Sequence, residues 1–393
     1  MRTSGSRDLA VVLSGGGING ALLELGFLER LRASELWPRV GWIYGTSAGA
    51  LAGTMAALDR LADLRRFLLE LEAEEVFRPR RVWQLPGGLH DYTLPATIAA
   101  RLGTAAELAG ALAEAEIELT VIATDVSSYP LDGDTRHFEL VYSSHATPPE
   151  TMAQAILASA AISALVLPVR IGEVVATDGG WVRNFPLEHA YRNPAVQGIA
   201  AFRYVSSYRP TDPSYLERLR ERLERFRAVP PVRALLAEVR LAEERAQRGE
   251  PAHYAELIVR LMRVAIARNT VLEERLAEER ETSVAELQRL RREVVEAALA
   301  AVPPWRRRRV RAELEARFAS ARFPFRHDRH LPLLVVRGTP GEDGLDPTFR
   351  SDRPWPAEQK LALAERGYRL TDEALARSPS FPSSAGTPAG ARG

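Results

Sequence analysis

The feature that most constrains the fold is the pentapeptide Gly-Thr-Ser-Ala-Gly at positions 45–49. A short apolar run at 42–44 precedes it, and an alanine- and leucine-rich run at 50–58 follows it. A strand that turns into a helix through Gly-x-Ser-x-Gly is the nucleophile-elbow pattern, in which the sharp turn strains the serine backbone. Gly45 and Gly49 leave room for neighbouring backbone to pass close to the turn. The pattern predicts that the Ser47 hydroxyl stands at a helix N-terminus, where the dipole favours negative charge. For these five residues alone, an ordinary glycine-rich turn is the alternative.

A second glycine-rich segment follows the first predicted strand. Residues 9–13 are uniformly apolar, which is typical of a strand buried on both faces, and residues 22–31 have the broad apolar face of a helix. The loop between them is Ser-Gly-Gly-Gly-Ile-Asn-Gly at 14–20. Several backbone N–H groups at a helix N-terminus make a ready anion site. We therefore expect an oxyanion hole here, because a tight turn without chemistry would leave the triple glycine unexplained.

The same loop also permits a nucleotide-binding interpretation. The spacing Gly15-x-Gly17-x-x-Gly20 fits the dinucleotide fingerprint. That fingerprint needs an acidic residue at the end of the next strand to bind the ribose. The next predicted strand ends instead in the serine elbow, and Glu35 lies too early in the chain. The oxyanion-hole interpretation is therefore favoured.

An aspartate ends a later strand-like run. The mostly apolar residues 173–176 lead into Thr177, Asp178, Gly179 and Gly180. The two glycines predict a sharp loop, from which the Asp178 carboxylate can face a partner. A plain turn is the alternative, because Asp-Gly is a common turn dipeptide.

The composition limits the class of protein. The chain has 393 residues, enough for one large domain with an insertion or for two domains. It contains no cysteine, which excludes disulfides, thiolate metal sites and cysteine nucleophiles. The formal net charge of +1 gives no global attraction for nucleic acid. Because no His, Asp and Glu grouping has metal-ligand spacing, we expect no metal, and we expect no other cofactor. We also expect no nucleic-acid partner, because no recognition motif accompanies the basic residues.

The sequence also carries an expectation about location. Residues 1–8 are polar, and no apolar run reaches the ~18 residues that a membrane span needs. We expect a cytoplasmic protein, with peripheral membrane contact as an option. An arginine-rich patch beside a tryptophan can touch an anionic membrane surface, although an exposed basic helix without a ligand is the alternative. The patch consists of Trp305, Arg306, Arg307, Arg308 and Arg309, with Arg311 following.

The chain changes character at about residue 208. From there to residue 330, Arg, Glu, Ala and Leu dominate with helical periodicity, which breaks at 230–231, near 249–251 and at 303–304. We expect these helices to carry solvated faces with i,i+4 ion pairs. The expected domains are a catalytic core over 8–207 completed by 331–376, a charged helical subdomain over 208–330 and a disordered tail over 377–393. Further strands are expected over 117–124, 137–142, 166–171, 173–176, 198–205 and 331–337, and helices over 58–75, 94–115, 151–161, from 187, and over 356–376.

Together the three motifs resemble those of the patatin-like phospholipase family. The glycine loop at 15–20, the elbow at 45–49 and the Asp-Gly-Gly at 178–180 fall in the family's order, with lesser matches at 124–125 and 158–162. The resemblance implies an α/β fold, a three-layer α/β/α sandwich, to which the all-helical segment is inserted or appended. It also implies a serine lipid acyl hydrolase that cleaves fatty-acyl esters of phospholipids or related lipids.

Carried over by motif, the resemblance makes Ser47 the nucleophile and Asp178 the base of a dyad without histidine. A carboxylate is a weak base at its usual pKa of about 4, so burial must raise the pKa of Asp178. The family often has a basic residue at position 19, where this chain has Asn19, which puts cationic help to the oxyanion in doubt. The implied oxyanion hole is Gly15, Gly16, Gly17 and Ile18, and Gly20, Gly45, Gly49, Gly179 and Gly180 support the motifs.

Three alternatives stay open at this point. A Ser-His-Asp triad would need a histidine after Asp178; His189 follows closely, and the others are His253, His327 and His330 in the helical region. The protein can also be a catalytically idle binding module that uses the helical segment as a scaffold. The third alternative is the nucleotide-binding protein described above.

Overall fold

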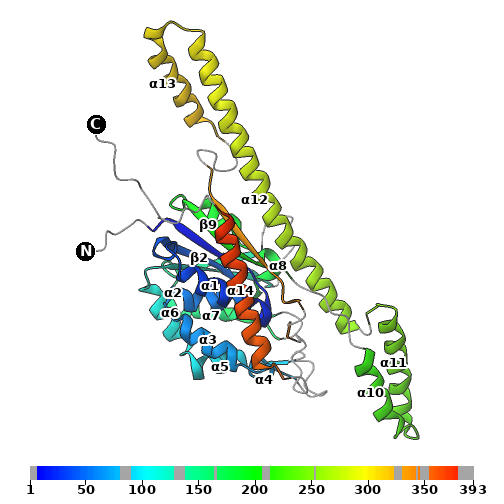
Figure 1. The fold of residues 1–393 in the computed structure, drawn as a ribbon. Helices are drawn as coiled ribbons and strands as arrows, with labels where there is room; N and C mark the ends of the chain where they lie inside the picture. Colours follow the sequence, from blue (N-terminus) through cyan, green and yellow to red (C-terminus); the bar gives the residue numbers. More distant parts are fainter. Residues whose placement is uncertain are drawn as a thin grey trace.

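The computed structural model describes residues 7–79, 90–127, 138–162, 166–205, 213–251, 254–322, 330–341, 344–345 and 354–378. Its centre is an eight-stranded sheet in the order β10-β9-β1-β2-β5-β8-β7, with β6 paired to β5 (Figure 1). The strands are β1 (Leu9–Leu13), β2 (Val40–Thr46), β5 (Glu118–Asp125), β6 (Glu139–Ser143), β7 (Val169–Ile171), β8 (Val174–Asp178), β9 (Gly198–Tyr204) and β10 (Leu333–Gly338). A separate hairpin pairs β3 (Phe77–Pro79) with β4 (His90–Tyr92).

The sheet is parallel from β10 through β5 and antiparallel beyond it. Strands β10, β9, β1, β2 and β5 run in one direction, whereas β8 and β6 oppose β5. Because parallel strands end at the same edge, the loops after β1 and β2 lie side by side. The predicted strand over 331–337 is therefore confirmed: it joins the sheet as β10, far from the rest in sequence.

Helices cover both faces of the sheet, as the expected three layers require. Alternate residues of β1 belong to two different cores: Leu9, Val11 and Leu13 face one, and Ala10 and Val12 face the other. The first face carries α1 (Gly17–Arg32), α2 (Ala48–Ala57), α3 (Leu61–Glu70), α4 (Ala73–Val76), α5 (Leu94–Arg101), α6 (Ala105–Ala113), α7 (Pro149–Ser159) and α14 (Ala357–Arg377). The second face carries α8 (Gly180–Arg183), α9 (Leu187–Arg192) and part of α12 (Tyr254–Ala300).

Two long predicted helices are each divided in the structure. The helix expected over 58–75 is α3 followed by α4, and the one expected over 94–115 is α5 followed by α6. The second break has a clear local cause. Gly103 adopts φ +114°, and Thr104 caps α6 by accepting a hydrogen bond from the Glu107 N–H. The apolar periodicity runs through both breaks, so it could not reveal them.

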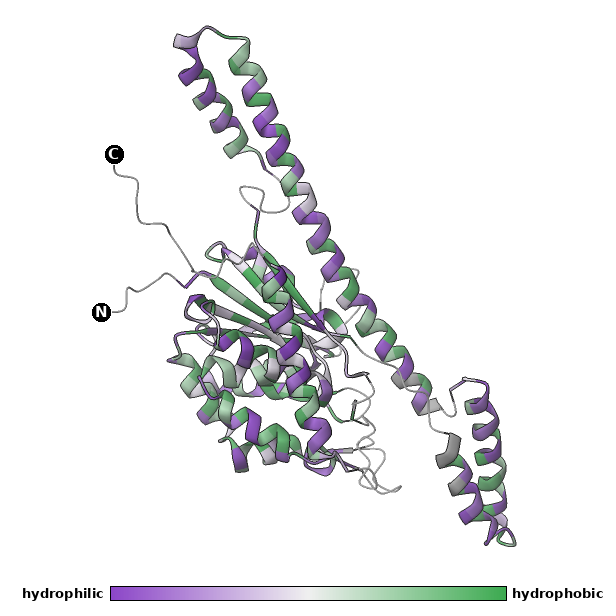
Figure 2. Cartoon of the chain, in the orientation of Figure 1, coloured by the Kyte–Doolittle hydropathy of each residue, from purple (hydrophilic) through white to green (hydrophobic). Residues whose placement is uncertain are grey.

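The charged region forms four helices, which are α10 (Pro213–Glu224), α11 (Pro230–Gln247), α12 and α13 (Pro304–Ser320). The three predicted breaks are confirmed: α11 begins at Pro230, residues 249–251 lie between α11 and α12, and α13 begins at Pro304. Helix α12 runs along the core and projects beyond it, with α10 and α11 near one end and α13 folded back at the other (Figure 1). Polar and apolar residues alternate around these helices, whereas the central strands are mostly apolar (Figure 2). The predicted disordered tail lies outside the described residues from 379 onward.

Candidate active site

The sheet register brings Ser47 and Asp178 to the same level. Thr46, the last residue of β2, pairs with Ile122 of β5, and the next β5 residue, Ala123, pairs with Asp178 at the end of β8. Ser47 therefore leaves β2 at the height where β8 ends. The Ser47 side chain is a neighbour of the Asp178 carboxylate and lowers the pKa of that group.

Ser47 has the strained backbone that the elbow pattern predicts. Its φ is 55° and its ψ is −120°, and it directly precedes α2. The turn requires both flanking glycines, because a Cβ on Gly45 would lie 2.5 Å from the Gly49 carbonyl oxygen and one on Gly49 would lie 2.7 Å from the Leu13 oxygen. The Ser47 N–H donates to Ser159 Oγ at 2.9 Å. The buried Ser159 thus fixes the elbow from α7, a role that its small-residue block did not reveal.

Asp178 is a buried carboxylate with the properties of a base. It is 5% exposed, and its Oδ1 accepts the Gly180 N–H at 2.7 Å. Burial raises the pKa of Asp178 to about 6, although the hydrogen bonds from Ser47 and Gly180 oppose this rise. The loop that follows is tightly packed, since a Cβ on Gly179 would lie 2.2 Å from the Ile122 oxygen. The carboxylate is therefore ionised near neutral pH but is a stronger base than an exposed aspartate.

The glycine loop begins α1 next to the elbow. Gly17 has φ +57°, and the Gly20 N–H donates to the Gly16 oxygen at 2.9 Å. The first N–H groups of a helix have no partner within that helix, and the described residues supply no acceptor to those of Gly16, Gly17 and Ile18. These three amides are free to receive an anion. The Gly15 N–H is not, because it donates to the Asn184 oxygen at 3.0 Å. The expectation that Gly15 belongs to the donor set is corrected accordingly.

Asn19 has a structural task. Its Oδ1 accepts the Leu345 N–H at 2.8 Å, and its Nδ2 donates to the Leu345 oxygen at 3.1 Å. The side chain therefore fastens the start of α1 to a segment beyond β10. An arginine here could not accept the first of these bonds, which accounts for the amide at this position.

The described histidines do not contact the Ser47–Asp178 pair. His189 Nε2 lies 2.8 Å from Glu139 and its ring stacks on Tyr44, while His330 Nε2 lies 3.0 Å from Glu281. His145 contacts the Ala115 oxygen. The side chain of His90 and all of His137, His253 and His327 lie outside the described residues. In the described ranges, no cluster of His, Asp and Glu side chains is arranged to hold a metal.

An apolar cavity lies beside the elbow. It has a volume of about 50 Å³ and is walled by six helices, α1, α2, α3, α5, α6 and α7. Ala48, which directly follows Ser47, and Leu51 belong to its lining, as do Met55, Phe67, Ile156 and Leu157. The cavity holds a few carbon atoms as it stands, so a long chain would need these helices to separate.

Comparison with known proteins assigns the core. The family model for Patatin-like phospholipase matches residues 11–191. The chain carries a patatin-like phospholipase domain. A domain of this family supports lipid acyl hydrolase activity in general. Among solved structures, VipD from Legionella pneumophila aligns with 13% sequence identity and a TM-score of 0.41, over 95% of this chain and 67% of that chain. No curated protein matches the sequence.

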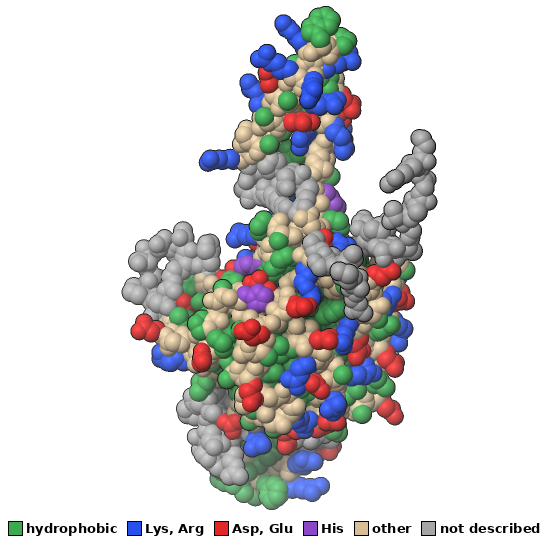
Figure 3. Space-filling model, turned by 90° about the vertical axis from the view of Figure 1, so that its left-hand side faces the viewer, with side chains coloured by type: hydrophobic (Ala, Val, Ile, Leu, Met, Phe, Trp, Pro, Cys, Tyr) green, Lys and Arg blue, Asp and Glu red, His purple; other side chains and the backbone are tan. Residues whose placement is uncertain are grey.

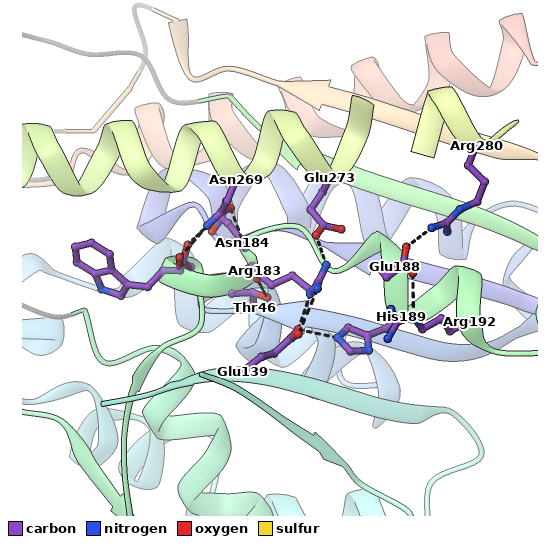
Figure 4. A network of polar contacts seen from close by, with 12 residues as sticks. Thr46, Glu139, Arg183, Asn184, Glu188, His189, Arg192, Asn269, Glu273 and Arg280 are labelled. Atoms are coloured by element: carbon purple, nitrogen blue, oxygen red, sulfur yellow. Dashed lines mark hydrogen bonds and ion pairs between the residues drawn. The ribbon is translucent and has the colours of Figure 1, made fainter. Parts of the chain in front are cut away.

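The patatin-like domain contains the elbow, Asp178 and most of the glycine loop's strand and helix, and it ends within α9. Helix α12 lies outside it in sequence but reaches it in space. Arg183 of α8 binds both Glu139 of β6 and Glu273 of α12, and Asn269 of α12 faces the loop after Asp178 (Figure 4). The composition of the helical region gave no sign of these contacts. Among the described helices, none is long and apolar enough for a membrane crossing.

Proposed function

We propose that the protein hydrolyses fatty-acyl esters of phospholipids or related lipids, with Ser47 as nucleophile and Asp178 as base. The observation that carries this proposal is the placement of the strained Ser47 beside the buried Asp178 carboxylate, at the level where β2 and β8 both end. A nucleophile within hydrogen-bond reach of its base is the arrangement that acyl transfer requires. The neighbouring amides of Gly16, Gly17 and Ile18 are suited to an oxyanion, and the apolar cavity is suited to the first carbons of an acyl chain.

The steps follow from this geometry. Ser47 Oγ attacks the ester carbonyl carbon while Asp178 takes the hydroxyl proton, and the resulting oxyanion accepts hydrogen bonds from the glycine-loop amides. The ester C–O bond then breaks, and Asp178 returns the proton to the leaving alcohol. In the second half, Asp178 takes a proton from water, which attacks the acyl-enzyme carbon. The Ser47 ester breaks, the proton returns to Ser47, and the fatty acid leaves.

Covalent labelling with a fluorophosphonate, together with hydrolysis of a short fluorogenic ester, tests the proposal. Wild type should be labelled and active, Ser47→Ala should be unlabelled, and its kcat should fall at least ~10³-fold. Ser283→Ala is the matched control, because Ser283 is an exposed serine on α12 that bonds only the Glu279 oxygen among the described residues. Wild type that stays unlabelled in the presence of lipid or detergent would contradict the proposal and favour a binding module.

The pH dependence gives a second test of the same pair. The Asp178 carboxylate must be ionised to take the proton, so kcat/KM should rise as pH passes through about 6 and then level off. If a histidine were the base, replacing it would abolish the pH dependence of kcat/KM. The dyad instead predicts that His189→Ala and His330→Ala have the same pH dependence as wild type. A profile that either change abolishes would favour a Ser-His-Asp triad instead.

We also propose that the tip of the α12–α13 hairpin contacts an anionic membrane surface. Trp305 is 79% exposed, and Arg307, Arg308 and Arg311 line an open groove of about 590 Å³ whose other walls include Leu299 and Pro304. Basic side chains gather on this projecting end of the molecule (Figure 3). An exposed tryptophan next to clustered cations suits the interface of an acidic bilayer.

Sedimentation with vesicles tests this contact. Binding to phosphatidylcholine vesicles should increase when phosphatidylserine is included, and Trp305→Ala and the pair Arg307→Gln and Arg308→Gln should weaken it. The control pair Arg275→Gln and Arg289→Gln removes the same charge from exposed positions of α12. The proposal would be contradicted if the control pair weakened vesicle binding as much as the Arg307 and Arg308 pair. Equal binding to vesicles with and without phosphatidylserine would also contradict it.

A further inference from the structure

One asparagine joins the two loops that flank Ser47. Asn184 lies six residues after Asp178, and its backbone oxygen accepts the Gly15 N–H at 3.0 Å. Its side-chain Nδ2 donates back to the Gly15 oxygen at 3.3 Å. The amide fills the space between the loops, since a Cβ on Gly15 would lie 2.3 Å from Asn184 Oδ1 and one on Gly180 would lie 3.0 Å from it. Displacing Asn184 would therefore move the glycine loop and the Asp178 loop together.

Asn184 is itself held from outside the patatin-like domain. Asn269 of α12 accepts the Asn184 N–H with its Oδ1 at 3.2 Å. Its Nδ2 donates to the oxygens of Gly180 and Trp181 at 2.7 and 3.1 Å. Both amide hydrogens and the amide oxygen are thus used, and all three bonds end on α8 or the residue after it (Figure 4).

The next residue of α12 adds a contact to the Asn184 side chain. Thr270, which is 3% exposed, accepts the Asn184 Nδ2 hydrogen at 2.9 Å while its own hydroxyl donates to the Ile266 oxygen at 2.7 Å. One turn further on, Glu273 binds Arg183. Residues spaced three and four apart share one helix face, so this face of α12 lies directly on the short helix that follows Asp178.

We propose that Asn269 and Thr270 are positioning residues for the acyl-transfer site, so that the helical segment is a working part of the active site. Through Asn184 they fix the distance of the glycine-loop amides and of Asp178 from Ser47. This inference rests on the proposed function, but its residues lie outside the residues that the family model matches. Small misplacement of catalytic groups lowers kcat more than substrate binding, and an error of about 1 Å can cost ~10²-fold.

The test compares four variants of α12 in the full-length protein. Asn269→Ala should lower kcat and the rate of fluorophosphonate labelling ~10- to 100-fold with little change in KM, and it should move the pH midpoint of kcat/KM. Thr270→Ala should lower kcat ~10-fold, whereas Thr270→Ser, which keeps the hydroxyl, should stay within ~3-fold of wild type. Thr282→Ala is the control, because Thr282 makes the same local bond to the oxygen four residues earlier but is exposed.

The outcomes separate this inference from the proposed function. If Asn269→Ala and Thr270→Ala match wild type while Ser47→Ala is unlabelled, the positioning role is wrong and the proposed function stands. If Ser47→Ala is labelled like wild type, the proposed function itself fails. Thermal melts followed by circular dichroism measure the folded fraction of each variant. A kcat that falls only in proportion to the folded fraction, or a Thr270→Ser variant as impaired as Thr270→Ala, would also overturn the positioning role.

Discussion

Two stretches of helix α12 have similar sequences but different ion-pair partners, because they lie at different positions relative to the core. The inner stretch of α12, residues 269–281, and the outer stretch, residues 286–300, are both rich in Arg and Glu. In the inner stretch Glu273, Glu274 and Arg280 pair with Arg183, Arg203 and Glu188 of the core. In the outer stretch Arg289 pairs with Glu286 and Glu293 of its own helix. The inner pairs link distant segments, whereas the outer pairs form wherever the helix forms.

Solvent exposure gives these pairs different energies. The Arg183 and Glu273 side chains are 18% and 15% exposed, whereas those of Arg289 and Glu286 are 55% and 53% exposed. An exposed pair gains little because water and salt screen it. Removing one member of a buried pair leaves an uncompensated charge, which is costly. Each prediction below bears on this contrast, beginning with the largest effect.

Arg183→Ala should be the most damaging change among these pairs. It removes the cation shared by Glu139 and Glu273, and burial already raises the pKa of Glu273 although Arg183 opposes this. We expect the free energy of unfolding at pH 7 to fall by about 4 kcal/mol, measured by urea denaturation. A loss below about 1 kcal/mol would mean that the inner stretch is no more tightly coupled to the core than an exposed pair.

Asp178→Asn should stabilise the folded protein, because this buried carboxylate has hydrogen bonds but no cation beside it in the described residues. Its folded-state pKa of about 6 is above the unfolded value, so ionisation opposes folding and stability is lost as pH rises from about 4 to 6. Above pH 7 the variant should be more stable than wild type by about 3 kcal/mol, and near pH 4 the two should be equal. It should also be inactive. Equal stability of both proteins at pH 7.5 would contradict the raised pKa.

Glu139 should make the folded protein sensitive to acid. Burial alone would raise its pKa, but hydrogen bonds from His189 and Arg183 and their charges lower it to about 2. A lowered folded-state pKa stabilises the protein above the unfolded value near 4.5, and that stability is lost as pH falls towards 2. After allowing for solvent screening at this half-buried site, we expect the lowered pKa of Glu139 to contribute about 2 kcal/mol to the free energy of unfolding. Urea denaturation should show that the free energy of unfolding of wild type falls between pH 6 and pH 2.5. The fall should be smaller in Glu139→Gln.

The sequence predicted the elbow, the glycine loop and the aspartate because each is a local pattern with its own backbone requirement. Gly45, Gly49 and Gly179 are needed where another backbone passes close by, and such needs are visible in single residues. The sequence did not predict Asn269, whose three bonds depend on where α12 lies against α8. An asparagine in a charged helix has the same local pattern whether it faces water or a catalytic loop. The interpretation of the region as solvated faces therefore fits the outer stretch and misses the inner one.

Arg289→Ala should have the smallest effect on stability among these substitutions. The change removes two ion pairs, the same number that Arg183→Ala removes, but both partners lie within four residues on one exposed helix. Alanine is a better helix former than arginine, which offsets the small loss of i,i+3 and i,i+4 attraction. We expect no measurable change in the urea midpoint or in kcat. A clear loss of stability would show that the outer stretch makes further contacts besides these local ion pairs. The number of ion pairs, rather than their burial, would then determine how much stability each substitution removes.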